Sequence, residues 1–185
     1  MENTNIPNIE NTNENTTEIP HQEAIQKESS EQPTEKKYIQ LKGKQKKFDQ
    51  ELYEKYDIPA RKIIKEKLGD NVDDNPDIYA EDMIIKDPKC KYKFIELQVC
   101  TSWVGTEYPF QQPYVYERKG NFSKKTLFII FNRYMNKGLL FDKDSLSKEP
   151  CRIKKYSRTL VHTIPWYRVI KFTVDDLNME TIYMY

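Results

Sequence analysis

The chain has 185 residues, 37% of them hydrophobic and 32% charged, which leaves room for one domain and a tail but not for two domains. No apolar run approaches the roughly 20 residues that a membrane span needs, and no glycine-rich loop is present to cradle a nucleotide. The three cysteines, Cys90, Cys100 and Cys151, form no C-x-x-C pair, which argues against a structural zinc site and fits a reducing compartment. We therefore predict an intracellular protein, cytoplasmic or nuclear and not secreted, whose oligomeric state the composition leaves open.

Charge divides the chain into three parts. Residues 1–35 contain eight Glu, one Lys and almost no large apolar side chain, so residues 1–36 are predicted to be a disordered acidic tail. A basic linker is predicted at 37–47 and a single domain at 48–185. Of the 30 basic and 29 acidic residues in the whole chain, 29 and 21 then follow the acidic segment, an excess of eight positive charges. This excess favours a polyanionic partner, and a solvated Lys/Glu surface is an equal alternative.

The first predicted elements are helical. Phe48, Leu52 and Tyr56 recur every four residues, which predicts a short amphipathic helix. A second helix is expected to begin near Pro59, because the missing N–H of proline costs nothing in a first helical turn. Gly69 is expected to end this second helix.

An antiparallel hairpin is expected next. Residues 78–85 and 92–100 have strand-like patterns, and the tight connection of residues 87–90 joins them. Pro113 is then expected to open a crossover helix that ends at Gly120.

The C-terminal part is predicted to be rich in strands. Residues 126–132 are apolar on both faces and predict a central strand. Further strands are expected at 139–141, 152–155 and 168–174. The predicted fold class is α/β, bordering on α+β, with few helices covering a mixed sheet.

The hairpin carries two acidic residues that are expected to lie opposite each other. A turn centred on Lys89 places Asp82 directly across from Glu96, with their Cβ atoms about 4.5–5.5 Å apart. Two carboxylates this close repel each other, so a cation is expected between them, and Mg²⁺ or Mn²⁺ is the natural candidate. Because side chains alternate along a strand, Gln98 is expected on the same face as Glu96.

These residues resemble the PD-(D/E)XK nuclease superfamily. The resemblance rests on the residues from Asn75 to Asp82 followed by those from Phe94 to Val99, and the expected element order from Phe48 to Phe131 agrees with it. In that family an Asp on one strand and a (D/E)-x-K on the next hold the catalytic metal, in a restriction-endonuclease-like mixed sheet.

The resemblance implies that Asp82 and Glu96 are the metal ligands. Asp77 follows an actual Pro, as the family motif prescribes. Its partner in the expected hairpin would be Thr101, however, so the geometry favours Asp82.

The sequence departs from the family pattern at one position. Gln98 stands where the family usually has Lys, although some relatives have Gln there and others place the Lys on the following helix. Lys119, or Arg118 beside it, is expected on the crossover helix and would neutralise developing charge, while Gln98 would position a water. Some relatives also use an acid from the first helix, and here Glu51 and Glu54 are equal candidates.

Two functions follow from the resemblance. The first is a metal-dependent nuclease that hydrolyses DNA phosphodiesters, as an accessory of repair, recombination or replication, with Asp82, Glu96, Gln98 and Lys119 as catalytic residues and Mg²⁺ (or Mn²⁺) as cofactor. The alternative is a catalytically degenerate nuclease fold that binds nucleic acid or serves assembly. Both imply a nucleic acid partner, DNA in the first case, and no membrane. A third hypothesis is an unrelated small α+β protein that serves only protein contacts and binds neither metal nor DNA. The alternative to a metal site is a sheet face on which Asp, Glu and Gln serve only solubility.

Several other side chains have a plainer interpretation. Trp103, Tyr108 and Phe110 follow the second hairpin strand in a loop, and Trp166 and Tyr167 lie in another. Aromatic side chains on loops stack on bases in some proteins, but capping of the core is the expected role. His162 lies among apolar residues and is expected to be structural.

Overall fold

A computed structural model gives the fold, and it describes residues 49–153 and 159–185. The predicted acidic tail (1–36) and basic linker (37–47) lie outside these ranges. So do residues 154–155 of the predicted strand at 152–155. None of the described helices is long and apolar enough to cross a membrane.

The described chain begins with one long helix in place of the two predicted ones. It consists of α1 (Gln50–Leu52), the π-helical turn η1 (Tyr53–Asp57) and α2 (Ile58–Leu68). The ring of Pro59 would collide with the carbonyl group four residues earlier in a regular α-helix. The wider π turn lies directly before this proline, so the helix continues where a break was expected. Gly69 ends the helix with a φ of 58°, as predicted.

Six of the described strands form a mixed sheet in the order β1-β2-β3-β5-β6-β9. The first three pair antiparallel, β5 runs parallel to β3, and β6 and β9 again pair antiparallel. The strands are β1 (Val72–Asp74), β2 (Met83–Ile85), β3 (Phe94–Cys100), β5 (Thr126–Asn132), β6 (Lys137–Asp142) and β9 (Ile170–Thr173). The mixed sheet that the sequence predicts is therefore present, with β5 inside it and buried over its whole length.

A second sheet replaces the predicted crossover helix. Its strands are β4 (Tyr114–Tyr116), β8 (Leu160–Thr163) and β7 (Cys151–Arg152), in the order β4-β8-β7. The prediction of a helix from Pro113 to Gly120 was wrong because aromatic and β-branched residues favour a strand, and β4 finds an antiparallel partner in β8. A 3₁₀ helix, η3 (Glu117–Asn121), follows β4 directly.

Short elements complete the described part of the chain. The 3₁₀ helices η4 (Lys143–Ser145) and η6 (Trp166–Arg168) connect strands. The 3₁₀ helix η2 (Gly69–Asn71) joins α2 to β1, and η7 (Val174–Asp176) joins β9 to α3 (Met179–Met184). Neither α3 nor β8 was predicted from the sequence. The predicted strand at 78–85 is also shorter than expected, because only Met83–Ile85 pair with a neighbour.

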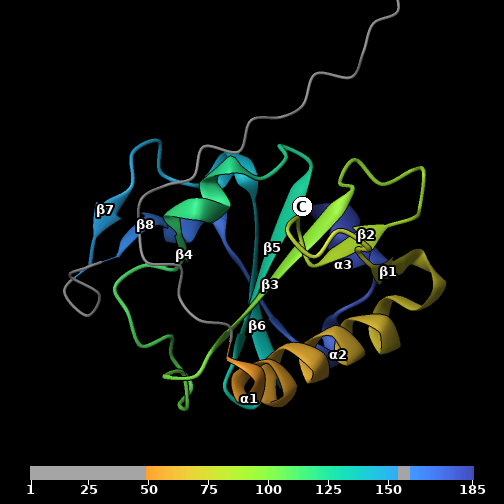
Figure 1. The fold of residues 1–185 in the computed structure, drawn as a ribbon, viewed down its shortest axis with the longest axis horizontal. Coiled ribbons are helices and arrows are strands. Elements are labelled where there is room, and N and C mark those ends of the chain that lie inside the picture. The colour runs from red at the N-terminus through yellow and green to blue at the C-terminus, as the bar shows by residue number, and fades with distance from the viewer. Residues whose placement is uncertain (1–48, 154–158) are drawn as a thin grey trace, which may run out of the picture. The chain divides into compact units, whose positions relative to one another are not determined.

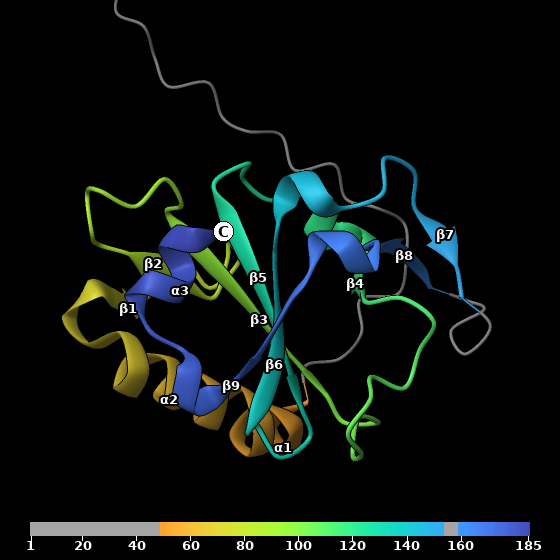
Figure 2. The same cartoon turned by 180° about the vertical axis from the view of Figure 1, so that it is seen from behind.

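The two faces of the six-stranded sheet pack against different partners. Leu127, Ile129 and Phe131 of β5 belong to a core with α2 and α3, whereas Phe128 and Ile130 belong to a core with β4. Figures 1 and 2 show α2 and α3 on the side of β1 and β2, and the second sheet on the opposite side. This double coverage explains why β5 is apolar on both faces.

Candidate active site

The hairpin of β2 and β3 has the register that a turn centred on Lys89 produces. Met83 pairs with Ile95 and Ile84 with Phe94. Asp82 directly precedes β2, so the same register continued by one residue brings it to Glu96. The side-chain oxygen Oδ2 of Asp82 accepts a hydrogen bond from the backbone N–H of Leu97 at 2.8 Å. The predicted proximity of these two acids is therefore present in the fold.

Glu96 and Gln98 share one face of β3, as the alternation predicts. Their neighbours Ile95 and Leu97 pack into the core that contains α2. Glu96 pairs across the sheet with Phe128, which belongs to the other core. Glu96 is only 6% exposed, so its carboxyl group is removed from bulk water.

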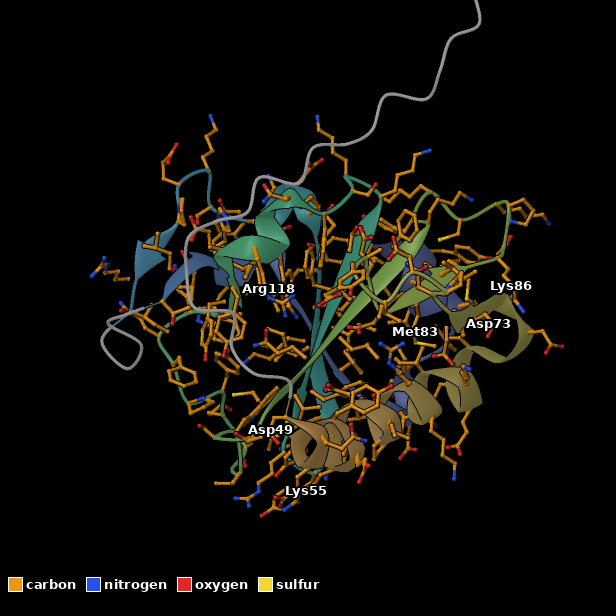
Figure 3. All side chains as sticks on the ribbon, viewed as in Figure 1. Asp49, Lys55, Asp73, Met83, Lys86 and Arg118 are labelled. Carbon is orange, nitrogen blue, oxygen red and sulfur yellow. The ribbon has the colours of Figure 1, made fainter. Side chains whose placement is uncertain are left out.

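Lys119 meets Glu96 in the interior. Its ammonium nitrogen Nζ lies 2.6 Å from Glu96 Oε1 and donates to the carbonyl oxygen of Leu97 at 3.3 Å. The side chain is only 4% exposed although it comes from η3 and not from the predicted crossover helix. Arg118, the other expected candidate, is exposed on η3. Figure 3 shows η3, which carries Arg118, and β2, which carries Met83, on either side of β3. Lys119 thus reaches the acidic residues as expected, but from a 3₁₀ helix and not from a crossover helix.

Arg61 of α2 neutralises Asp82 and was not singled out from the sequence. Its Nη2 lies 2.5 Å from Asp82 Oδ1, and its Nη1 donates to the backbone carbonyl of Asp82 and to Asp74 Oδ1. The charged side chains Arg61, Asp82, Glu96 and Lys119 are named the Asp82–Glu96 cluster below. Arg61 is recognised as part of the cluster only in the three-dimensional structure, because no sequence motif links the first helix to the hairpin.

Burial raises the pKa of Glu96 to about 7, with the ion pair to Lys119 opposing the rise and the negative charge of Asp82 adding to it. A carboxyl group with so high a pKa receives too little positive charge to offset its loss of hydration. An additional cation near Asp82 and Glu96 would lower this pKa. The charges of the cluster are therefore compatible with the bound cation that the sequence predicts.

Asp57, in η1, is the acid of the first helix that interacts with the cluster. The residue is exposed overall, yet its pKa is raised, first by burial of the carboxyl group and then by the negative charge of Asp82. The predicted candidates Glu51 and Glu54 are both exposed, and Glu54 accepts a hydrogen bond from Gln50. The π turn places Asp57 on the cluster side of the helix, which a regular helical pattern does not reveal.

Gln98 presents a buried acceptor. Its amide nitrogen donates to the carbonyl oxygen of Tyr114 at 3.5 Å, while its Oε1 is buried without a hydrogen-bond partner among the described residues. Buried polar atoms are nearly always paired, either with protein groups or with water. Gln98 Oε1 is therefore suited to accept from a water or a ligand on the face that carries Glu96.

The neighbouring acids have other roles. Asp77 is exposed in a turn, where its Oδ1 accepts from the backbone N–H of Tyr79. Glu81 is buried, and its Oε1 accepts from Ser123 N–H and from the Thr126 hydroxyl at 2.9 and 2.6 Å. The preference for Asp82 over Asp77 therefore agrees with the structure.

The aromatic residues and His162 have structural surroundings. Trp103 and Tyr108 are buried in the core with β4, and Phe110 packs against it. Nδ1 of the His162 ring lies 2.8 Å from the carbonyl oxygen of Ser147. Of the aromatic residues predicted to lie in loops, Tyr167 remains largely exposed.

Comparisons with protein-family models, with curated proteins and with solved structures were made for the whole chain. None of the three found a match. Any proposal about function therefore rests on the sequence and the structure of this chain.

The donor set fits a hard divalent cation. Asp82, Glu96 and the Leu97 carbonyl supply only oxygen atoms, the ligands that Mg²⁺ and Mn²⁺ prefer. Lys119 already contacts Glu96 Oε1 and the Leu97 carbonyl oxygen. Arg61 and the Leu97 N–H contact the two Asp82 oxygens, so a cation would have to share or replace these contacts. Within the described ranges no three His, Cys, Asp or Glu side chains are grouped to hold a metal by themselves. A Mg²⁺ ion bound by one or two carboxylates retains several waters, so two carboxylates suffice.

Proposed function

We propose that this protein is a metal-dependent nuclease of the PD-(D/E)XK type that hydrolyses DNA phosphodiesters. The observation that carries the proposal is the buried contact of 2.6 Å between Lys119 and Glu96, beside Asp82. Lys119 is distant in sequence from both acids, and a solvated acidic surface has no use for a buried lysine there. The order of elements supports the proposal in part, since a helix and three antiparallel strands precede a strand parallel to the third. Between β3 and β5, however, β4 and η3 stand where the family has a crossover helix.

The chain's own residues have distinct tasks in this proposal. Asp82 and Glu96 would hold a divalent ion, whose chemistry is to lower the pKa of a water and to stabilise the leaving oxygen. Lys119 would place positive charge beside the phosphate as negative charge develops on it. Gln98 Oε1 would orient a water through its unpaired acceptor position. Asp82, whose side chain is 25% exposed, would be the part of the cluster that solvent and substrate reach.

Cleavage of supercoiled plasmid in the presence of Mn²⁺ tests the proposal. Wild-type protein and Asp77→Asn should both convert plasmid to nicked or linear product. Asp82→Asn and Glu96→Gln should not. Asp77→Asn is the matched control, because it makes the same chemical change in the segment before β2, outside the cluster. Equal cleavage by all four proteins would contradict the proposal.

A second candidate function is a nuclease fold without catalysis that binds nucleic acid. The observation that favours it is the pairing of each acid with a protein cation, Asp82 with Arg61 and Glu96 with Lys119. Because each carboxylate is paired with a positively charged side chain, the cluster does not need a metal ion to balance its charge. In that case the protein would bind DNA, and neither cleavage nor binding of Mn²⁺ would be detected.

A further inference from the structure

The loop between β1 and β2 has two large apolar side chains that are exposed to solvent. Ile78 is 84% exposed and Tyr79 is 83% exposed. Ile78 and Tyr79 are adjacent in sequence, and Asp82 of the Asp82–Glu96 cluster lies three residues after Tyr79. Single exposed apolar residues are common on protein surfaces, but a pair at a loop tip beside a charged cluster needs an explanation.

Hydrogen bonds hold this loop in one arrangement. Asn75 Oδ1 accepts from Asp77 N–H, and Asp77 Oδ1 accepts from Tyr79 N–H. The backbone of Asn75 donates to the carbonyl of Asp82 at 3.1 Å, which closes the loop at the cluster itself. These bonds define the backbone of the turn that carries Ile78 and Tyr79, and a preorganised backbone lowers the entropic cost of binding.

Two exposed lysines flank the loop. Glu81 accepts hydrogen bonds from Ser123 and Thr126, which ties the loop to the segment that contains Lys124 and Lys125. Both lysines are exposed. The exposed Asp77 adjoins the apolar tip, and the positive charge comes from Lys124 and Lys125 beyond Glu81. The apolar tip suits bases, and the two lysines suit phosphates.

We infer that Ile78 and Tyr79 form a stacking tip that takes unpaired bases of the DNA strand whose phosphate lies at the Asp82–Glu96 cluster. The inference rests on the proposed function and names its substrate class, DNA with unpaired bases at single strands, ends or junctions. Three residues span at most about 10 Å of extended chain, and stacked bases are about 3.4 Å apart. The tip therefore contacts bases within about three nucleotides of the phosphate at the cluster.

Binding of two fluorescein-labelled DNAs in EDTA tests this inference without cleavage. One is a single-stranded oligonucleotide, and the other is a blunt-ended duplex of the same strand with its full complement. Loss of one stacking contact of about 1–3 kcal/mol corresponds to about 5- to 150-fold in affinity. Tyr79→Ala should weaken binding of the single strand by a factor in this range, and Tyr79→Trp should restore it. Binding of the blunt-ended duplex should stay unchanged.

Tyr134→Ala is the matched control. Tyr134 is 64% exposed and follows the end of β5, whereas the Asn75–Asp82 loop is tied to the beginning of β5. This variant should bind both DNAs like the wild type. Unchanged single-strand binding by Tyr79→Ala, or equal weakening of both DNAs, would overturn the inference.

Cleavage of the same two DNAs separates this inference from the proposed function. If both DNAs are cut at equal rates by wild type and by Tyr79→Ala, the stacking tip is wrong and the nuclease stands. If Tyr79 supports single-strand binding and neither DNA is cut with Mn²⁺, the nuclease is wrong and the stacking tip stands as a binding site.

Discussion

Glu96 is the residue whose ionisation controls the cluster. Burial raises its pKa to about 7, Lys119 lowers it and Asp82 raises it further. A carboxyl group binds a divalent ion in its ionised form, so cleavage should fall as the pH drops through about 7. Carbon-13 NMR of labelled Glu side chains should show one carboxyl that titrates near pH 7. Its pKa should decrease in Asp82→Asn and increase in Lys119→Met, and unchanged titration in both variants would contradict the assignment.

The same pKa predicts how stability depends on pH. The pKa of Glu96 is raised above the ordinary value of 4.5 to about 7. The folded state therefore binds more protons than the unfolded state between these two values, and the free energy of unfolding should decrease as the pH rises from about 4.5 to about 7. Urea unfolding at several pH values measures this slope. Glu96→Gln should reduce the slope in this window, and an identical slope in the variant would refute the account.

Lys119 is the second residue on which catalysis should depend. A donor that stabilises developing charge typically contributes about 10²–10³ in rate. Lys119→Met should therefore lower cleavage by about this factor while the far-UV circular dichroism stays native. Arg118→Met is the control, because Arg118 is adjacent and exposed. An equal loss in both variants would indicate general weakening of DNA binding and not a role specific to Lys119.

At the scale of elements, η3 is held in place by a close approach to β8. A Cβ atom at Gly120 would lie 2.4 Å from Nε2 of His162, so alanine does not fit without movement. Gly120→Ala should destabilise the fold by about 1–3 kcal/mol. It should also reduce cleavage, because Lys119 precedes this glycine. Gly105→Ala is the control, since no atom lies within 4 Å of its added Cβ. Equal midpoints of urea unfolding for the two variants would contradict this role of η3.

The elements also show what the sequence can and cannot predict. The β2–β3 register followed from one short turn and strict alternation, and β5 followed from its continuous apolar run. The contact of Lys119 with Glu96 was expected, but the crossover helix predicted to carry Lys119 is absent. The strand preference of β4 is satisfied by pairing with β8, which is distant in sequence. Arg61 and Asp57 reach the cluster through the packing of the helix against the sheet. No local pattern in the sequence encodes such contacts.

At the scale of the whole molecule, the proposed binding of DNA should depend on salt. Residues 36–185 carry 29 basic and 21 acidic side chains. Phosphate contacts release counterions, so DNA affinity should fall by about tenfold or more between 50 and 200 mM salt. Fluorescence anisotropy with a labelled oligonucleotide measures this dependence. An affinity that does not change with salt would contradict an electrostatic mode of DNA binding.

The central claim is that Asp82 and Glu96 share a divalent ion beside Lys119. Calorimetric titration of the full chain with Mn²⁺ tests it most directly. Wild-type protein and Asp77→Asn should each bind Mn²⁺, and this binding should be lost in both Asp82→Asn and Glu96→Gln. Absence of Mn²⁺ binding by the wild type, or equal binding by all four proteins, would contradict the claim.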